Sequence, residues 1–66
     1  MIKLEIWKYR NARGLSLREL SARCGISKSA LQRMESGEIS PTLDQLDRIA
    51  AALDVPLTKL FIAQRE

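Results

Sequence analysis

Apolar residues recur at helical spacing along most of this 66-residue chain. Between positions 16 and 35 the pattern divides into two short amphipathic segments, one on each side of Gly25. The apolar positions are Leu17, Leu20 and Cys24 in the first segment and Ala30, Leu31 and Met34 in the second. This spacing predicts two short helices that each bury one face.

Both segments carry their own helix start signal. Ser16 can cap the first helix, and Glu19, three residues later, completes a capping box. Gly25 can adopt the left-handed backbone that ends a helix and allows a sharp turn. Ser27 then offers a new N-cap. The order of these signals predicts a helix-turn-helix over residues 16–35.

The opening segment fits two patterns. Ile2, Leu4 and Ile6 alternate as in a strand, whereas Ile2, Ile6 and Tyr9 fit one face of a helix. Because no second strand is visible to pair with it, we expect a helix over residues 1–13.

Two further helices are expected after the loop at Pro41. Thr42 and Gln45 form a second capping box, and the helix that they start has the most regular apolar face of the chain. Its expected core positions are Leu43, Leu46, Ile49, Ala50 and Leu53. Pro56 is expected to start a last helix with apolar Leu57, Leu60, Phe61 and Ile62.

The second helix of the motif has a polar face opposite its apolar one. This face carries Lys28, Ser29, Gln32 and Arg33. Arg can pair with guanine and Gln with adenine in the major groove of DNA, which admits a helix of this size. A solvated polar face without a ligand is the alternative, but two capped helices around a glycine favour DNA contact.

Composition excludes most other function classes. The chain has no His and a single Cys, which removes most metal sites, the common nucleophilic triads and any internal disulfide. We therefore expect neither an enzyme nor a cofactor. We read Cys24 as a core residue. The net charge is +3, with Lys and Arg concentrated in residues 1–33, an uneven distribution compatible with nucleic acid. No apolar run approaches the length of a membrane span, and the N-terminus lacks a signal-peptide pattern, so we expect a cytoplasmic protein that does not bind membranes.

Most of the chain resembles the Xre/Cro phage-repressor family of helix-turn-helix DNA-binding domains. The matching residues run from about Ile6 to Phe61 and include 13–16, 19–21, 25–27, 34–37 and 40–42. The resemblance implies a single all-α domain over residues 1–66, a compact five-helix bundle whose third helix, residues 27–35, enters the major groove. It places Lys28, Ser29, Gln32 and Arg33 at the bases.

The resemblance also implies contacts to the DNA backbone. The expected phosphate contacts are Ser16, Leu17, Arg18, Ser27, Ser36, Ser40 and Thr42. Many family members have Gln where this chain has Leu17, so only backbone amides at the helix N-terminus would bind phosphate there. Capping and loop polarity are alternative roles for Ser36, Ser40 and Thr42. Asp54 replaces a frequent Gly, which predicts a strained turn.

Two further expectations concern an ion pair inside the domain and a surface for dimerisation. Arg10 is expected to form an ion pair with Glu35, tying the first helix to the third. The apolar surface left over in the last helix, at Leu57, Phe61 and Ile62, is a possible dimer surface. A weak homodimer on a palindromic operator would place two recognition helices about 34 Å apart; the alternative is a monomer.

The expected function is therefore sequence-specific binding of double-stranded DNA by a small transcriptional regulator, most simply a repressor. An antitoxin or a protein-interaction module with a DNA-binding-like fold, which would bind a protein partner, is the alternative. Similar domains elsewhere carry a sensory domain. We expect none here, and we therefore expect any signal to arrive through concentration, a partner or proteolysis.

Overall fold

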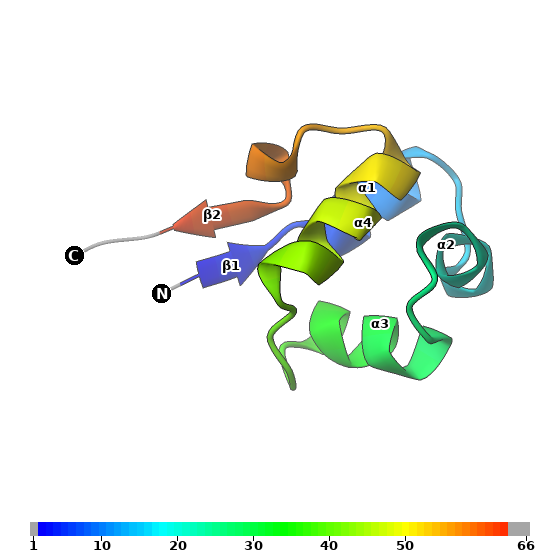
Figure 1. The fold of residues 1–66 in the computed structure, drawn as a ribbon, viewed down its shortest axis with the longest axis horizontal. Helices are drawn as coiled ribbons and strands as arrows, with labels where there is room; N and C mark the ends of the chain where they lie inside the picture. Colours follow the sequence, from blue (N-terminus) through cyan, green and yellow to red (C-terminus); the bar gives the residue numbers. More distant parts are fainter. Residues whose placement is uncertain (1, 64–66) are drawn as a thin grey trace.

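The structure, a computed structural model, describes residues 2–63 and contains four α-helices, one 3-10 turn and two short strands (Figure 1). In chain order these are β1 (Ile2–Leu4), α1 (Ile6–Ala12), α2 (Leu17–Cys24), α3 (Lys28–Ser36), α4 (Leu43–Leu53), the 3-10 turn η1 (Leu57–Lys59) and β2 (Phe61–Ala63). The predicted helix-turn-helix is formed by α2 and α3. No helix among the described residues is both long and apolar enough to cross a membrane.

Helix α4 lies at the centre of the helical body and packs against α1, α2 and η1 (Figure 1). Its Ile49 and Leu53 are fully buried, together with Leu20 of α2 and Leu31 of α3. Leu60, just after η1, closes the core from the other side of α4. Because each helix contributes a narrow apolar stripe, the core forms only when all of them dock.

The predicted helix ends are confirmed. The Ser16 hydroxyl accepts the Glu19 N–H at 3.0 Å, and the Glu19 carboxylate accepts the Ser16 N–H at 3.0 Å. Thr42 and Gln45 form the same reciprocal pair at 3.1 and 2.9 Å. Gly25 ends α2 with φ +75°, and Asp54 ends α4 with φ +56°, the strained left-handed conformation expected there.

The fold is not entirely helical, which corrects the expectation for the chain ends. Strands β1 and β2 form an antiparallel ribbon in which Leu4 faces Phe61 and Lys3 faces Ile62. The Glu5 N–H donates to the Leu60 carbonyl at 2.7 Å and continues this pairing. The strand-like alternation at the start of the chain was therefore the better interpretation up to Leu4, and the helix begins only at Ile6.

The expected fifth helix is replaced by the single 3-10 turn η1 and strand β2. The prediction of a five-helix bundle was wrong because the chain after Leu60 satisfies its backbone through the distant N-terminal strand. Phe61 and Ile62, neighbours along a strand, point to opposite faces of the ribbon. They do not form the single apolar surface expected from a helix.

Leu43 was also misplaced. The helical pattern assigned it to the core, yet its side chain is 71% exposed. Leu43 is the first residue of α4. Its position on the apolar face is right, but the helix extends here beyond the elements that it packs against.

Candidate nucleic-acid interface

Helix α3 is held in place by its own apolar face and by the turn before it. Leu31 and Met34 are buried, and so is Ile26 in the turn. The Ser21 hydroxyl of α2 donates to the Ile26 carbonyl at 2.6 Å, a bond across the turn that no pattern in the sequence predicted. Together these contacts fix the angle between α2 and α3.

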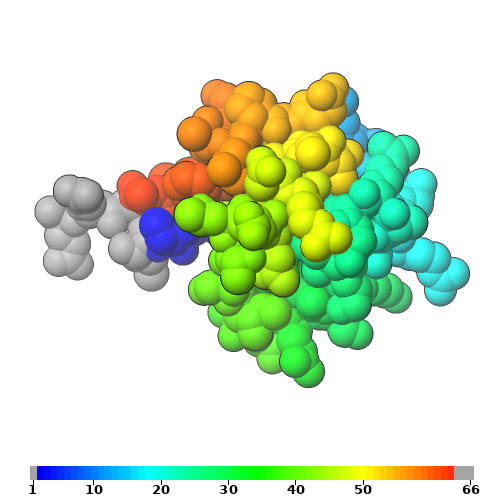
Figure 2. Space-filling model, in the orientation of Figure 1, coloured from blue at the N-terminus to red at the C-terminus, as the bar shows by residue number. Residues whose placement is uncertain are grey.

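The four predicted base-contacting residues lie on the exposed side of α3. Lys28, Ser29, Gln32 and Arg33 are all exposed, and within residues 2–63 none of their side chains is engaged in a hydrogen bond or ion pair. In the space-filling view, α3 and the loop after it form the lower edge of the molecule (Figure 2). The structure thus presents donors and acceptors on a projecting helix, the arrangement that reading a base edge requires.

The predicted phosphate-contacting hydroxyls occupy helix ends. Ser16, Ser27 and Thr42 accept backbone N–H groups as N-caps of α2, α3 and α4. A capping hydroxyl uses its oxygen as acceptor and retains its own proton as donor. Each cap can therefore still donate to a phosphate oxygen.

The two remaining serines among the predicted phosphate contacts are Ser36, the last residue of α3, and Ser40, in the loop before α4. The Ser36 hydroxyl lies 3.1 Å from the Arg33 carbonyl and 3.3 Å from a Glu38 carboxylate oxygen, to either of which it can donate. Its proton therefore already has intramolecular acceptors. Ser40 is exposed.

Leu17 and Arg18 open α2. The Leu17 side chain is half-buried and packs against the core, which leaves only its backbone N–H for a ligand. The first amides of a helix have no partner within the helix and attract anions. Arg18 is exposed beside them, so backbone and side chain can act on the same phosphate.

Arg10 and Glu35 form a bidentate pair. The Arg10 guanidinium donates to the two Glu35 oxygens at 2.7 and 2.9 Å and to the Leu15 carbonyl at 2.8 Å. The side chains are only 13% and 10% exposed. The hydrogen bond with Glu35 raises the pKa of Arg10 above its ordinary value. The pair joins α1 to the C-terminal end of α3 and orients that helix.

The remaining candidate groups lie apart from α3. Leu57 and Phe61 are half-buried against the core, and Ile62 is exposed on the ribbon. Cys24 is a free, buried thiol. Among the described residues no group of three or more His, Cys, Asp or Glu side chains could hold a metal ion.

Two capped helices around a left-handed glycine, with a projecting polar face on the second, define a helix-turn-helix domain of the DNA-binding type. The sequence model of the helix-turn-helix family matches residues 8–60, and the chain belongs to this family, in its Xre/Cro-like form.

Similar proteins are transcriptional regulators by name. The chain is 38% identical to the HTH-type transcriptional regulator SlrR of Bacillus subtilis over 65 residues, which cover 97% of this chain and 43% of SlrR. It is 34% identical to the HTH-type transcriptional regulator SinR of the same organism over 67 residues, covering 100% of this chain and 60% of SinR. The chain thus spans about half the length of these relatives.

The fold has a counterpart of known structure. The N-terminal DNA-binding domain of SinR from Bacillus subtilis superposes with a TM-score of 0.78 at 34% identity, covering 83% of this chain and 81% of that domain. The predicted family is confirmed by sequence and by fold.

Proposed function

We propose that this chain binds double-stranded DNA sequence-specifically as a transcriptional regulator and inserts α3 into the major groove. The observation that carries the proposal is the exposed face of Lys28, Ser29, Gln32 and Arg33 on a helix locked by the Ser21–Ile26 bond. The family of regulators to which the chain belongs supports it.

In this proposal two sets of groups contact the DNA, one at the bases and one at the phosphates. The α3 side chains discriminate bases, whereas helix N-termini and exposed basic residues hold phosphates and position the domain. Ser16, Leu17 and Arg18 serve one phosphate at the start of α2. Ser27 serves another at the start of α3, and Ser40 and Thr42 a third before α4. Ser36 is the weakest candidate because its proton already has intramolecular acceptors.

We extend the proposal to a cytoplasmic repressor that binds a palindromic operator as a weak homodimer. Blocking promoter access requires only occupancy of a site, which a small domain can provide. A two-fold symmetric pair would read two half-sites separated by about one turn of DNA, ~34 Å.

The deciding experiment is selection of bound duplexes from a randomised pool at near-physiological salt, followed by sequencing. We expect one enriched motif with two-fold symmetry. Salt-dependent retention of random DNA without enrichment would contradict sequence-specific binding. The protein-interaction module, including the antitoxin, would then be the better proposal.

A further inference from the structure

Glu38 is an acidic residue on the edge of the molecule that the proposed function places against DNA. It follows Gly37, which ends α3 with φ +84°, and its backbone N–H donates to the Arg33 carbonyl at 2.9 Å. Its side chain is exposed. Helix α3 and the loop that begins at Glu38 lie on the same lower edge in the space-filling view (Figure 2). The backbone bond therefore fixes Glu38 just beyond the helix proposed to read bases.

The other acidic side chains near this edge have a structural role. The Glu19 carboxylate accepts the Ser16 N–H in the capping box of α2, and Glu35 is paired with Arg10. Asp44 lies in the first turn of α4, where the helix dipole favours a negative charge. The stability of the fold therefore explains each of these three charges.

The stability of the fold does not explain the charge of Glu38. The carboxylate lies at the C-terminal end of α3, where the helix dipole favours a positive charge instead. Among residues 2–63 it forms no ion pair, and its hydrogen-bond partner there is the Ser36 hydroxyl at 3.3 Å. The effect of this charge is therefore to be sought in what approaches the edge from outside.

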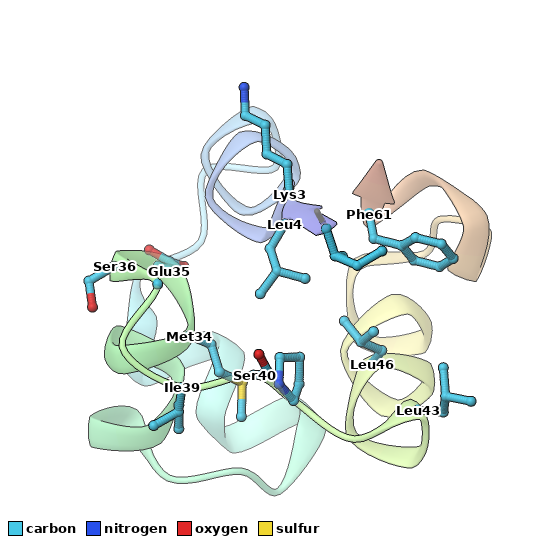
Figure 3. Close-up of a pocket in the computed structure, with 13 residues that line it drawn as sticks. Lys3, Leu4, Met34, Glu35, Ser36, Ile39, Ser40, Leu43, Leu46 and Phe61 are labelled. Carbon is cyan, nitrogen blue, oxygen red and sulfur yellow. The ribbon is translucent and has the colours of Figure 1, made fainter. Parts of the chain in front are cut away.

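Ser36 connects this carboxylate with the predicted phosphate contacts. The Ser36 side chain points outward from the end of α3, away from the open groove that Leu4 and Phe61 line (Figure 3). A serine hydroxyl has one proton to donate. The Glu38 carboxylate and the Arg33 carbonyl can both accept the proton of Ser36. Ser36 can therefore donate to a phosphate only by giving up an acceptor within the protein.

A phosphate that binds at Ser36 or Ser40 would also come close to Glu38, which lies between them in the chain. The carboxylate repels such a phosphate, and salt weakens the repulsion because the carboxylate is exposed. Glu38 thus acts against a phosphate contact in two ways, by its charge and by accepting the Ser36 proton. Neither effect depends on the base sequence, since phosphates carry no sequence information.

We propose that Glu38 opposes the binding of a phosphate at the C-terminal end of α3 and thereby lowers the affinity of this domain for DNA, an inference that rests on the proposed function. Affinity that is independent of sequence comes from neutralising phosphates. A carboxylate on the binding face reduces this contribution, so that retention on DNA depends more on the base contacts of α3.

The variant Glu38→Gln tests the effect of the charge, because Gln can still accept the Ser36 proton. Asp54→Asn is the matched control, since it changes the net charge equally at the other end of α4, and Asn tolerates the left-handed backbone of that position. Fluorescence anisotropy with a random-sequence duplex over a range of salt concentrations measures the affinities. Circular dichroism and thermal unfolding check that every form is folded.

At low salt we expect affinity to rise about threefold to tenfold in Glu38→Gln and less than about twofold in Asp54→Asn. The rise should shrink as salt increases, because salt screens the repulsion. An unchanged affinity in Glu38→Gln would overturn the proposal. An equal rise in both variants would also overturn it, because net charge rather than the position of Glu38 would then be responsible.

Ser36 is tested by removing its hydroxyl with and without the carboxylate. Beside Glu38, Ser36→Ala should change affinity less than about twofold. In the Glu38→Ala background the same substitution should lower affinity at least about threefold, because the hydroxyl has lost one competing acceptor and the phosphate is no longer repelled. Equal effects in the two backgrounds would overturn the proposal, since they would show that Glu38 opposes no phosphate contact at Ser36.

A second duplex, which carries the enriched motif, separates this inference from the proposed function. The rise in Glu38→Gln should be equal on the motif and on random DNA, whereas a rise confined to the motif would overturn the proposal by assigning the carboxylate to a base. If no form prefers the motif to random DNA, sequence-specific binding fails. The affinities for random DNA still decide the role of Glu38 in that case.

Discussion

The Arg10–Glu35 pair shows how one residue sets the position of the whole α3 helix. Arg10 uses three donors at once, two to Glu35 and one to the Leu15 carbonyl. Both side chains are largely removed from water. Removing one partner leaves the other charge without compensation in a poorly solvated place, which costs more than the net value of the pair.

We therefore expect Arg10→Ala to lower the free energy of unfolding by about 3 kcal/mol, a large part of the total for a domain of this size. Lys8→Ala is the matched control on the same helix. Lys8 is exposed, and the contact of its side chain is a cation–π contact, with the ammonium 5.4 Å from the centroid of the Tyr9 ring. This substitution should cost less than about 1 kcal/mol. Urea unfolding of the two variants measures the difference, and equal midpoints would show that the pair has no special role.

Arg33 and Arg18 differ in what they can touch. Arg33 lies on the exposed face of α3, and Arg18 lies in the first turn of α2. Arg33→Ala should relax preference at one base pair by roughly 1–3 kcal/mol, whereas Arg18→Ala should weaken binding to all sequences alike. Titration against the enriched duplex and its single-base variants measures both effects. The same uniform loss in both variants would refute the assignment of Arg33 to base reading.

At the scale of elements, the helix ends depend on reciprocal caps, and one of them is sensitive to pH. The Ser16 N–H donates to Glu19 and lowers the pKa of that carboxylate below its ordinary 4.5, with further lowering by the Ser16 side chain and by Arg23. A group whose pKa is lower in the folded state stabilises it above the ordinary pKa. This contribution is lost as the pH falls through the folded-state pKa.

Glu19→Gln tests this cap without removing it, because Gln can accept the Ser16 N–H as Gln45 accepts that of Thr42. The variant should be less stable than the unchanged protein at pH 7, since it lacks the charge that favours a helix N-terminus. The difference in the free energy of unfolding between the two proteins should decrease as the pH falls below 4.5. Urea unfolding at a series of pH values from 7 downward measures this difference. A difference in stability that does not depend on pH would contradict the role of the ionised carboxylate.

The elements that the sequence predicted well are those determined by near neighbours. A capping box joins residues three apart, and a left-handed glycine acts within one turn, so Ser16–Glu19, Thr42–Gln45 and Gly25 were visible in the sequence. The exposed face of α3 followed from its periodicity in the same way.

The ribbon depended instead on a partner almost sixty positions away, and a three-residue strand has little pattern of its own. Its alternation was noticed, but without a visible partner the helix was preferred. The prediction that Leu43 is a core residue was wrong for a related reason. Periodicity identifies the face of a helix but not where the neighbouring elements end. The open groove between the ribbon and the start of α4, which is lined by Leu4, Phe61 and Leu43, depends on both features and could not have been predicted from the chain alone.

At the scale of the whole molecule, the fold separates the candidate DNA-binding elements from the chain ends. Helix α3 lies on one side of α4, while η1 and β2 lie on the other (Figure 1). The Cα extents are 36 × 22 × 20 Å, larger than the distance of about 8–10 Å over which physiological salt screens a charge. The effect of a basic residue on DNA affinity should therefore depend on where it lies.

Arg18 and Lys59 provide a matched comparison, because both are exposed and each carries one positive charge, on α2 and η1 respectively. Affinity for duplex DNA should fall as salt rises, since each phosphate contact releases counterions. Arg18→Ala should reduce the slope of log affinity against log salt by about 1, whereas Lys59→Ala should leave it unchanged. Fluorescence anisotropy over a range of salt concentrations measures both slopes. Equal reductions would mean that net charge rather than the α2–α3 face governs binding, and the orientation proposed for the domain on DNA would then be wrong.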